Sequence, residues 1–264
     1  MTNQEAMLTM SHVSKTFYPG SPNQVNALQD VNLTVRQGDF ITLVGGNGAG
    51  KSTLLNAISG NFLPDTGDII VNGQNVTFFK EDKRAPYISR VFQDPKMGTA
   101  PRMTVQENLS LAYRRGQKRT LRFGTSHEEK AFFKEELKKL GLGLENRMGS
   151  DIGLLSGGQR QAIALLMATM KRPDILLLDE HTAALDPKTA KLVLELTNQQ
   201  VIDNNLTSIM ITHNLQDAIQ YGYRMLVLHH GQIMNDYDAE TKKTLTPEKV
   251  FAELQELSIQ DILV

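Results

Sequence analysis

Two glycine-rich segments carry residue types suited to binding phosphate groups. The first, GGNGAGKST (45–53), fits the pattern G-x-x-x-x-G-K-[ST] and follows an apolar run that is typical of a buried strand. Its glycines let backbone N–H groups wrap phosphate oxygens, Lys51 can neutralise two phosphates, and the Ser52 hydroxyl can ligate Mg²⁺. A glycine turn that only opens a helix is the alternative. We predict a nucleotide phosphate site formed by Gly45, Gly46, Asn47, Gly48, Ala49, Gly50, Lys51, Ser52 and Thr53.

The second segment, LLSGGQRQ (154–161), places a serine and two glycines just before an apolar helical pattern. Backbone N–H groups at such a helix start can bind phosphate, although this segment contains no lysine. A helix cap without any ligand is the simpler interpretation. A chain with one complete phosphate loop has no evident need for a second, and the residues alone do not explain it.

Two adjacent carboxylates end an apolar strand in ILLLDE (175–180). Ligand sites of open α/β sheets lie at such carboxyl ends, which favours a functional role over a simple cap for the next helix. Asp179 can hold Mg²⁺ directly or through water, and Glu180 can polarise an attacking water.

These motifs belong to a larger ordered set. GGNGAGKST, VFQDP, LLSGGQRQ, ILLLDE, AALD and ITHN follow one another along the chain in this order. Together they resemble the nucleotide-binding subunits of ABC transporters, and the resemblance covers the chain from about residue 8 to about residue 236. The resemblance implies that Ser156, Gly157 and Gly158 bind the γ-phosphate of an ATP held by a second, head-to-tail subunit. The missing lysine is then supplied by the facing loop.

The resemblance also implies roles for single residues. Gln93 matches a glutamine that reaches Mg²⁺ and the attacking water and lies where the transporter partner docks. His213 matches a histidine that contacts the γ-phosphate, and Asp186 matches an aspartate that communicates across the dimer. Phe17 matches the aromatic residue on which adenine stacks, with the adjacent Tyr18 as the alternative.

Apolar patterns around the motifs indicate the elements that position them. Residues 31–36 alternate like a half-buried strand, 40–44 form a buried strand, 51–60 a helix, and Asn72-Gly73 marks a hairpin. Beyond residue 156 helices and strands alternate, with strands at 175–179, 208–212 and 224–230. We therefore expect an α/β P-loop NTPase core with a mostly parallel sheet and an antiparallel β subdomain.

One helical stretch interrupts this core. Strand signals disappear from about 104 to 153, and Ser126 with Glu129 forms a capping box, which predicts an inserted helical subdomain. The basic segment RRGQKRTLR (114–122) within it is either a solvated loop or a contact for a partner or lipid headgroups. The chain is expected to be one domain (1–264) with a short helical tail from about 246.

Composition excludes several classes of function. The 264 residues carry 28 Lys plus Arg against 29 Asp plus Glu, so no global basic field favours nucleic acid. The absence of cysteine excludes disulfides and cysteine-ligated metals. The start lacks a signal-peptide pattern, and no run of about 18 apolar residues could span a bilayer. At a membrane, another subunit must therefore span it.

We expect a homodimeric ATPase that uses ATP and Mg²⁺, acts peripherally at the cytoplasmic face of the membrane and powers a separate permease. Import is favoured, with a solute-binding protein as a further partner, because DEHTAALDPKTA resembles ATPases associated with amino-acid uptake. A relative acting on DNA or ribosomes is disfavoured because heptads, cysteines and duplication are absent. A P-loop kinase or GTPase would not explain LSGGQ and ITHN.

Overall fold

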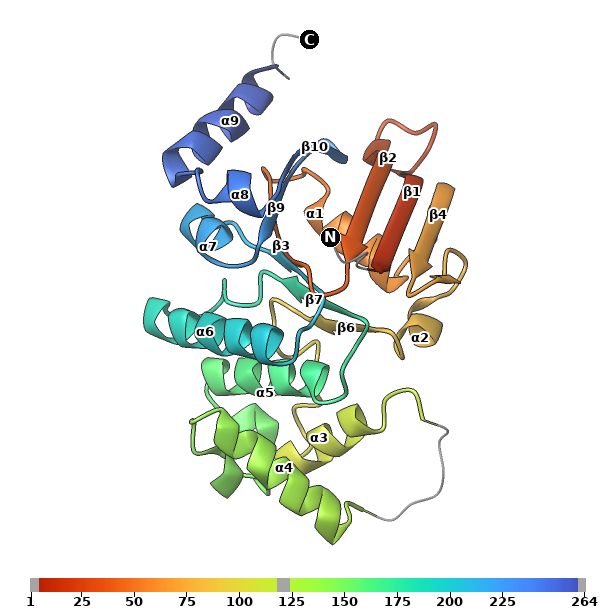
Figure 1. The fold of residues 1–264 in the computed structure, drawn as a ribbon. Helices are drawn as coiled ribbons and strands as arrows, with labels where there is room; N and C mark the ends of the chain where they lie inside the picture. The colour runs from red at the N-terminus through yellow and green to blue at the C-terminus, as the bar shows by residue number, and fades with distance from the viewer. Residues whose placement is uncertain (1–4, 118–123, 261–264) are drawn as a thin grey trace.

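A six-stranded sheet runs through the middle of the structure, a computed structural model that describes residues 5–117 and 124–260 (Figure 1). The strand order is β10–β9–β3–β8–β7–β6, and only β10 is antiparallel to its neighbour, which confirms the predicted sheet. The strands are β3 (Phe40–Val44), β6 (Ile88–Val91), β7 (Ile175–Asp179), β8 (Ser208–Ile211), β9 (Arg224–His229) and β10 (Gln232–Tyr237).

Helices cover both faces of this sheet, which is why its inner strands are mostly apolar. Leu176 and Leu178 of β7 face one core with helices α5 (Gly157–Thr169) and α6 (Pro187–Asp203). The alternate residues Ile175 and Leu177 face a second core with helix α1 (Lys51–Ser59). The strand period of two therefore divides one apolar run between two cores.

A second, antiparallel sheet packs against the α1 side of the core. Its order is β2–β1–β4–β5, with β1 (Ala6–Phe17), β2 (Val25–Arg36), β4 (Thr66–Val71) and β5 (Gln74–Asn75). Asn72 and Gly73 join β4 to β5 with φ of 48° and 75°, as the Asn-Gly signal predicted. The sequence analysis did not identify β1, although this strand pairs with both β2 and β4.

The segment from β6 to the start of α5 contains helices and no strands among its described residues, as expected from the loss of strand signals in the sequence. It contains α3 (Val105–Tyr113), α4 (His127–Lys139) and two 3₁₀ turns, η1 (Leu144–Asn146) and η2 (Ile152–Leu154). Reciprocal capping boxes start α3 at Thr104 and α4 at Ser126, the second of which was predicted. In Figure 1 these helices and the antiparallel sheet lie at different ends of the molecule.

The described part of the basic segment folds back on the chain. Arg114 pairs with Glu129 at 3.1 Å and donates to the carbonyl of Gly124. Arg115 is turned inward, where its Nη2 donates to the carbonyl of Lys171 at 2.6 Å. Residues 118–122 lie outside the described residues, so the choice between a solvated loop and a partner contact stays open for them.

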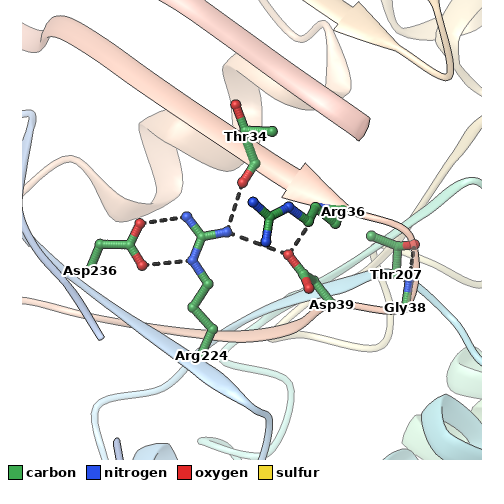
Figure 2. Close-up of polar contacts among 7 residues, drawn as sticks. All are labelled: Thr34, Arg36, Gly38, Asp39, Thr207, Arg224 and Asp236. Carbon is green, nitrogen blue, oxygen red and sulfur yellow. Dashed lines mark hydrogen bonds and ion pairs between the residues drawn. The ribbon is translucent and has the colours of Figure 1, made fainter. Parts of the chain in front are cut away.

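Arg224, at the start of β9, joins three parts of the fold (Figure 2). Its guanidinium pairs in a bidentate manner with Asp236 of β10, with Nε to Oδ1 at 2.6 Å. Its Nη1 donates to the carbonyl of Thr34 at 2.7 Å and lies 3.4 Å from Oδ2 of Asp39. Arg224 thus connects Thr34 of the antiparallel sheet and Asp39, just before β3, to β9 and β10, which form the C-terminal hairpin of the central sheet.

The remaining helices are short connections and a C-terminal helix, which was predicted. They are α2 (Glu81–Arg84), α7 (Leu215–Gln220), α8 (Ala239–Lys242) and α9 (Pro247–Gln260). Tyr237 of β10 holds α9 by donating its hydroxyl to Glu253 at 2.7 Å. Across residues 5–117 and 124–260, none of the helices has the length and apolar character needed to cross a membrane.

Candidate functional site

The predicted phosphate loop joins the end of β3 to the start of α1. Gly45 and Gly50 are required by close backbone approach, since a Cβ there would lie 2.2 Å from the carbonyl of Leu228 and 2.7 Å from that of Ala27. Gly50 also has φ of 99°, which favours glycine. A Cβ on Gly46 or Gly48 would meet nothing within 4 Å. The loop therefore packs closely against neighbouring backbone at Gly45 and Gly50, whereas there is free space beside Gly46 and Gly48.

Lys51 lies inside this loop. Its Nζ donates to the carbonyls of Gly45 at 2.8 Å and Gly46 at 2.9 Å. Burial lowers the pKa of Lys51, and the carboxylates of Glu180 and Asp179 act in the opposite direction. The two acidic residues predicted for the site thus lie close enough to act on the loop lysine electrostatically.

A cavity of about 460 Å³ brings most of the predicted nucleotide residues together. It is lined by residues 47–53 of the loop, by Glu180, and by Phe17, Tyr18, Val25 and Ala27 of the antiparallel sheet and its loop. The ring of Phe17 packs edge-on against Phe62, with centroids 5.3 Å apart, whereas Tyr18 is 70% exposed. Both aromatic residues border the cavity, so adenine stacking on either one stays a prediction.

Glu180 follows β7 in a backbone conformation with φ of 44°, which is uncommon for a residue with a side chain. Such strain is concentrated at functional sites. Its Oε2 lies 3.7 Å from Nδ1 of His213, which follows the neighbouring strand β8. The predicted water-polarising residue and the predicted phosphate-contacting histidine are therefore neighbours.

The residues proposed for Mg²⁺ offer hard oxygen ligands: the hydroxyl of Ser52, the amide of Gln93 and the carboxylate of Asp179. Within the described ranges, no group of three or more His, Cys, Asp or Glu side chains could cage a metal. Mg²⁺ is commonly held by one or two carboxylates together with substrate phosphates, so this donor set fits a metal that arrives with a nucleotide.

Arg90, which the sequence analysis missed, contacts this donor set. Its Nη2 lies 2.5 Å from Oδ2 of Asp179, and both side chains are largely buried. The available signal was an arginine among the mostly apolar residues ISRVF (88–92) that precede Gln93. Gln93 itself is exposed just after β6. Gln161 of α5 donates to the carbonyl of Phe92 at 3.1 Å and so connects α5 to the backbone beside Gln93.

The serine of LLSGGQRQ caps α5. Ser156 Oγ accepts from the backbone N–H of Gln159, whose side chain accepts from Ser156 N–H, both at 3.3 Å. Among the described residues that line the phosphate-loop cavity, none comes from this segment. The segment is nevertheless open at its start, since Ser156 is exposed and Leu154 is 73% exposed.

Gly158 has a packing role as well. A Cβ on this residue would lie 2.0 Å from Cγ2 of Thr189, so a side chain here would collide with Thr189 of α6 unless that residue moved. Asp186 is exposed and starts α6, where its carboxylate accepts from Thr189 N–H at 3.1 Å. Hydrogen bonding to the side chain and then to the backbone N–H of Thr189 lowers the pKa of Asp186.

Comparison with known proteins gives a consistent result. A family described as "ABC transporter" matches residues 28–183. A tyrosine transport ATP-binding protein of Clostridioides difficile (strain R20291) is 42% identical over 255 residues, which cover 94% of this chain and 99% of the relative. A putative hemin import ATP-binding protein of Staphylococcus haemolyticus (strain JCSC1435) is 34% identical over 86% of this chain and 98% of its own length.

A solved structure shares the fold. The ATP-binding cassette MJ0796, in a dimeric post-hydrolysis state bound to ADP and Pi, has a TM-score of 0.73 at 29% identity. The match covers 88% of this chain and 99% of that cassette.

Proposed function

The chain belongs to the ABC transporter family as an ATP-binding subunit, and from this premise we propose that it dimerises around two ATP molecules to power solute import. Subunits of this family are ATPases that power transport and associate with membrane permeases. The observation that carries the proposal is that the loop around Lys51 and the side chain of Glu180 line the same cavity.

The phosphate loop, Glu180, the neighbouring His213 and the aromatic residues have separate chemical tasks in this proposal. Backbone N–H groups of residues 45–53 bind the phosphates, and the ammonium of Lys51 moves from the loop carbonyls to phosphate oxygens. Glu180 orients the attacking water, and His213, 3.7 Å away, contacts the terminal phosphate. An aromatic face from Phe17 or Tyr18 supports adenine.

Ser52, Asp179 and Gln93 would hold the metal ion. When bound, Mg²⁺ would neutralise charge on the phosphate oxygens and so stabilise the transition state. The donor chemistry supports this assignment because all three side chains offer oxygen ligands.

The second glycine-rich segment is proposed to complete the site of a partner subunit. Ser156, Gly157 and Gly158 begin a helix of 13 residues whose N-terminus favours an anion, and they contribute nothing to the cavity of their own phosphate loop among the described residues. A head-to-tail homodimer gives each such helix a facing loop with a lysine. Asp186 lies nearby at the start of α6 and would communicate across the same interface.

We assign the whole chain to one ATPase domain, with residues of about 104–153 as an inserted helical subdomain. The permease would dock beside Gln93 and hold the subunit at the cytoplasmic face of the membrane. The contact between Gln161 and Phe92 supports this arrangement, because it connects the helix that starts at the signature to the segment that carries Gln93.

The proposed cargo is an amino acid, delivered by a solute-binding protein, because the relative that is 42% identical is a tyrosine transport protein. The test is to purify the tagged chain from membranes with its attached subunits, reconstitute them in liposomes, and measure ATP-dependent uptake of labelled tyrosine, other amino acids and hemin. Uptake of an amino acid that stops in a Glu180→Gln complex is expected. Transport of hemin alone, or no attached membrane subunit, would refute the proposal.

A further inference from the structure

Arg90 connects three segments of the ATPase site. It lies in β6, the edge strand that leads to Gln93, and its side chain is only 11% exposed. Its Nη2 donates to Oδ2 of Asp179 at 2.5 Å, and its Nη1 donates to Oδ1 of Asn56 at 2.6 Å. Asn56 belongs to α1, the helix that begins with Lys51.

The same guanidinium also lies over an aromatic ring. Its central carbon is 4.9 Å from the ring centroid of Phe92, the residue directly before Gln93. A planar guanidinium can hold a carboxylate, an amide and a ring at once, which an ammonium cannot do with equal precision. The position of Arg90 is therefore fixed from three sides, and so is the carboxylate that it contacts.

This contact changes what Asp179 can offer to a metal. The guanidinium occupies Oδ2 and leaves Oδ1 as the oxygen available for a cation. A fixed positive charge beside a carboxylate that is 14% exposed also reduces the attraction of that carboxylate for a second cation. A bound nucleotide would add negatively charged phosphate oxygens beside Asp179. Their charge would offset that of Arg90, so the site would then attract a divalent cation.

We propose that Arg90 is a positioning residue that orients Asp179 and lowers its affinity for a free divalent cation, so that the metal binds together with the nucleotide. This inference rests on the proposed role of Asp179 as a metal ligand. It gives a reason for a largely buried arginine in this edge strand, since charged side chains are seldom buried without a partner.

The alternative is that Arg90 only braces β6 against α1 and β7. The chain provides a matched control for that alternative, because Arg115 braces the same strand from the other side. Its Nη1 donates to Oγ of Ser89 and its Nη2 to the carbonyl of Lys171 at 2.6 Å. Ser89 precedes Arg90 in β6, and within the described ranges the hydrogen bonds of Arg115 go to Ser89, Ala168 and Lys171 rather than to Asp179.

The experiment measures binding of Mn²⁺, a spectroscopic substitute for Mg²⁺, by electron paramagnetic resonance with and without a non-hydrolysable ATP analogue. Arg90→Gln keeps an amide donor for Asp179 but removes the charge, Arg90→Lys keeps the charge, and Arg115→Met is the control. Thermal unfolding of each variant reports the structural contribution separately.

We expect Arg90→Gln to bind Mn²⁺ without nucleotide about tenfold more tightly than the wild type, and Arg90→Lys to stay within about threefold. Arg115→Met should lower the melting temperature while Mn²⁺ affinity stays within about twofold. An unchanged or weaker Mn²⁺ affinity in Arg90→Gln would overturn the inference.

Asp179→Asn separates this inference from the proposed function. If Asp179→Asn weakens Mn²⁺ binding with nucleotide while Arg90→Gln changes nothing, the metal ligand stands and only the role of Arg90 is rejected. If Asp179→Asn leaves Mn²⁺ binding unchanged, the metal assignment fails and the role of Arg90 fails with it. Arg90→Met, which removes both donor and charge, repeats the measurement if Arg90→Gln does not fold.

Discussion

Nδ1 of His213 lies 3.7 Å from Oε2 of Glu180, although the two residues follow different strands. The register of the sheet causes this proximity, because Asp179 at the end of β7 pairs with Ile211 at the end of β8. In a parallel sheet, the residues after adjacent strands emerge at the same edge. A group that can orient water and a group that can contact phosphate are therefore neighbours, and the first of them, Glu180, also lines the cavity of the loop lysine.

Glu180→Gln should keep ATP binding and abolish turnover. The amide is nearly the same size as the carboxylate but cannot polarise water, so we expect ATP hydrolysis to fall at least about a hundredfold. The ATP-bound dimer should accumulate and be detectable by size-exclusion chromatography with multi-angle light scattering.

Glu195→Gln is the matched control for this prediction, because Glu195 is an exposed residue of α6 away from the cavity. Its hydrolysis rate should equal that of the wild type. Steady turnover in Glu180→Gln at a rate close to that of Glu195→Gln would remove Glu180 from its role.

A mixed dimer should show whether Ser156 serves its own chain's ATP or its partner's. Lys51→Ala damages the phosphate loop, and Ser156→Arg fills the anion-facing start of α5. Each homodimer should be inactive. If loop and signature come from different chains, the mixed dimer combines both defects in one site and restores the other, so one tightly held ATP per dimer is expected in a filter-binding assay.

Subunit exchange in that experiment must be verified with two affinity tags. If loop and signature belonged to the same site within one chain, each site of the mixed dimer would keep one defect. Absence of captured ATP in a doubly tagged dimer would therefore reject the shared site.

Gly158→Ala should destabilise the protein through a specific steric contact. The added Cβ would lie 2.0 Å from Cγ2 of Thr189, so the Thr189 side chain or the backbone of the two helices must shift. We expect the free energy of unfolding to fall by about 1–3 kcal/mol. The double variant Gly158→Ala/Thr189→Ser, which lacks Cγ2, should recover most of the loss in urea unfolding, whereas Thr189→Ser alone should change little.

A double variant no more stable than Gly158→Ala would show that the contact with Thr189 is not the cause. Both variants keep the backbone N–H of residue 158, the group proposed to bind phosphate. The comparison therefore separates the steric effect of the added Cβ from the proposed phosphate binding. ATP-dependent dimerisation should therefore return together with stability.

Arg224→Met should weaken the junction between the two sheets and the C-terminal hairpin. It leaves Asp236 and Asp39 without their shared cation and removes the donor to Thr34, so we expect a loss of about 1–3 kcal/mol. Urea unfolding followed by circular dichroism measures it. Lys243→Met, which breaks an exposed pair with Glu240, is the control and should change stability by less than about 1 kcal/mol. Equal effects of the two variants would contradict the role assigned to Arg224.

Sequence patterns predicted the structure correctly where the interactions that fix it lie within a few residues of one another. The glycine and lysine positions of the phosphate loop, the Asn72-Gly73 hairpin and the cap at Ser126 depend on backbone conformation and neighbouring hydrogen bonds within a few residues. Burial on both faces makes β3 and β7 continuous apolar runs, so both strands were predicted from the sequence. Strands β1, β6 and β10 were missed because pairing across the sheet, rather than a strong apolar period, defines them.

The sequence by itself therefore determined which residues could bind phosphate, metal and water, and that a mostly parallel sheet would carry them. Only the tertiary structure decided which of them meet. It placed Arg90 against Asp179 and Asn56, His213 beside Glu180, and Gly158 against Thr189. These contacts join residues distant in the chain, and they are fixed by strand register and helix packing, which depend on burial summed over the whole core and leave no short-range pattern to read.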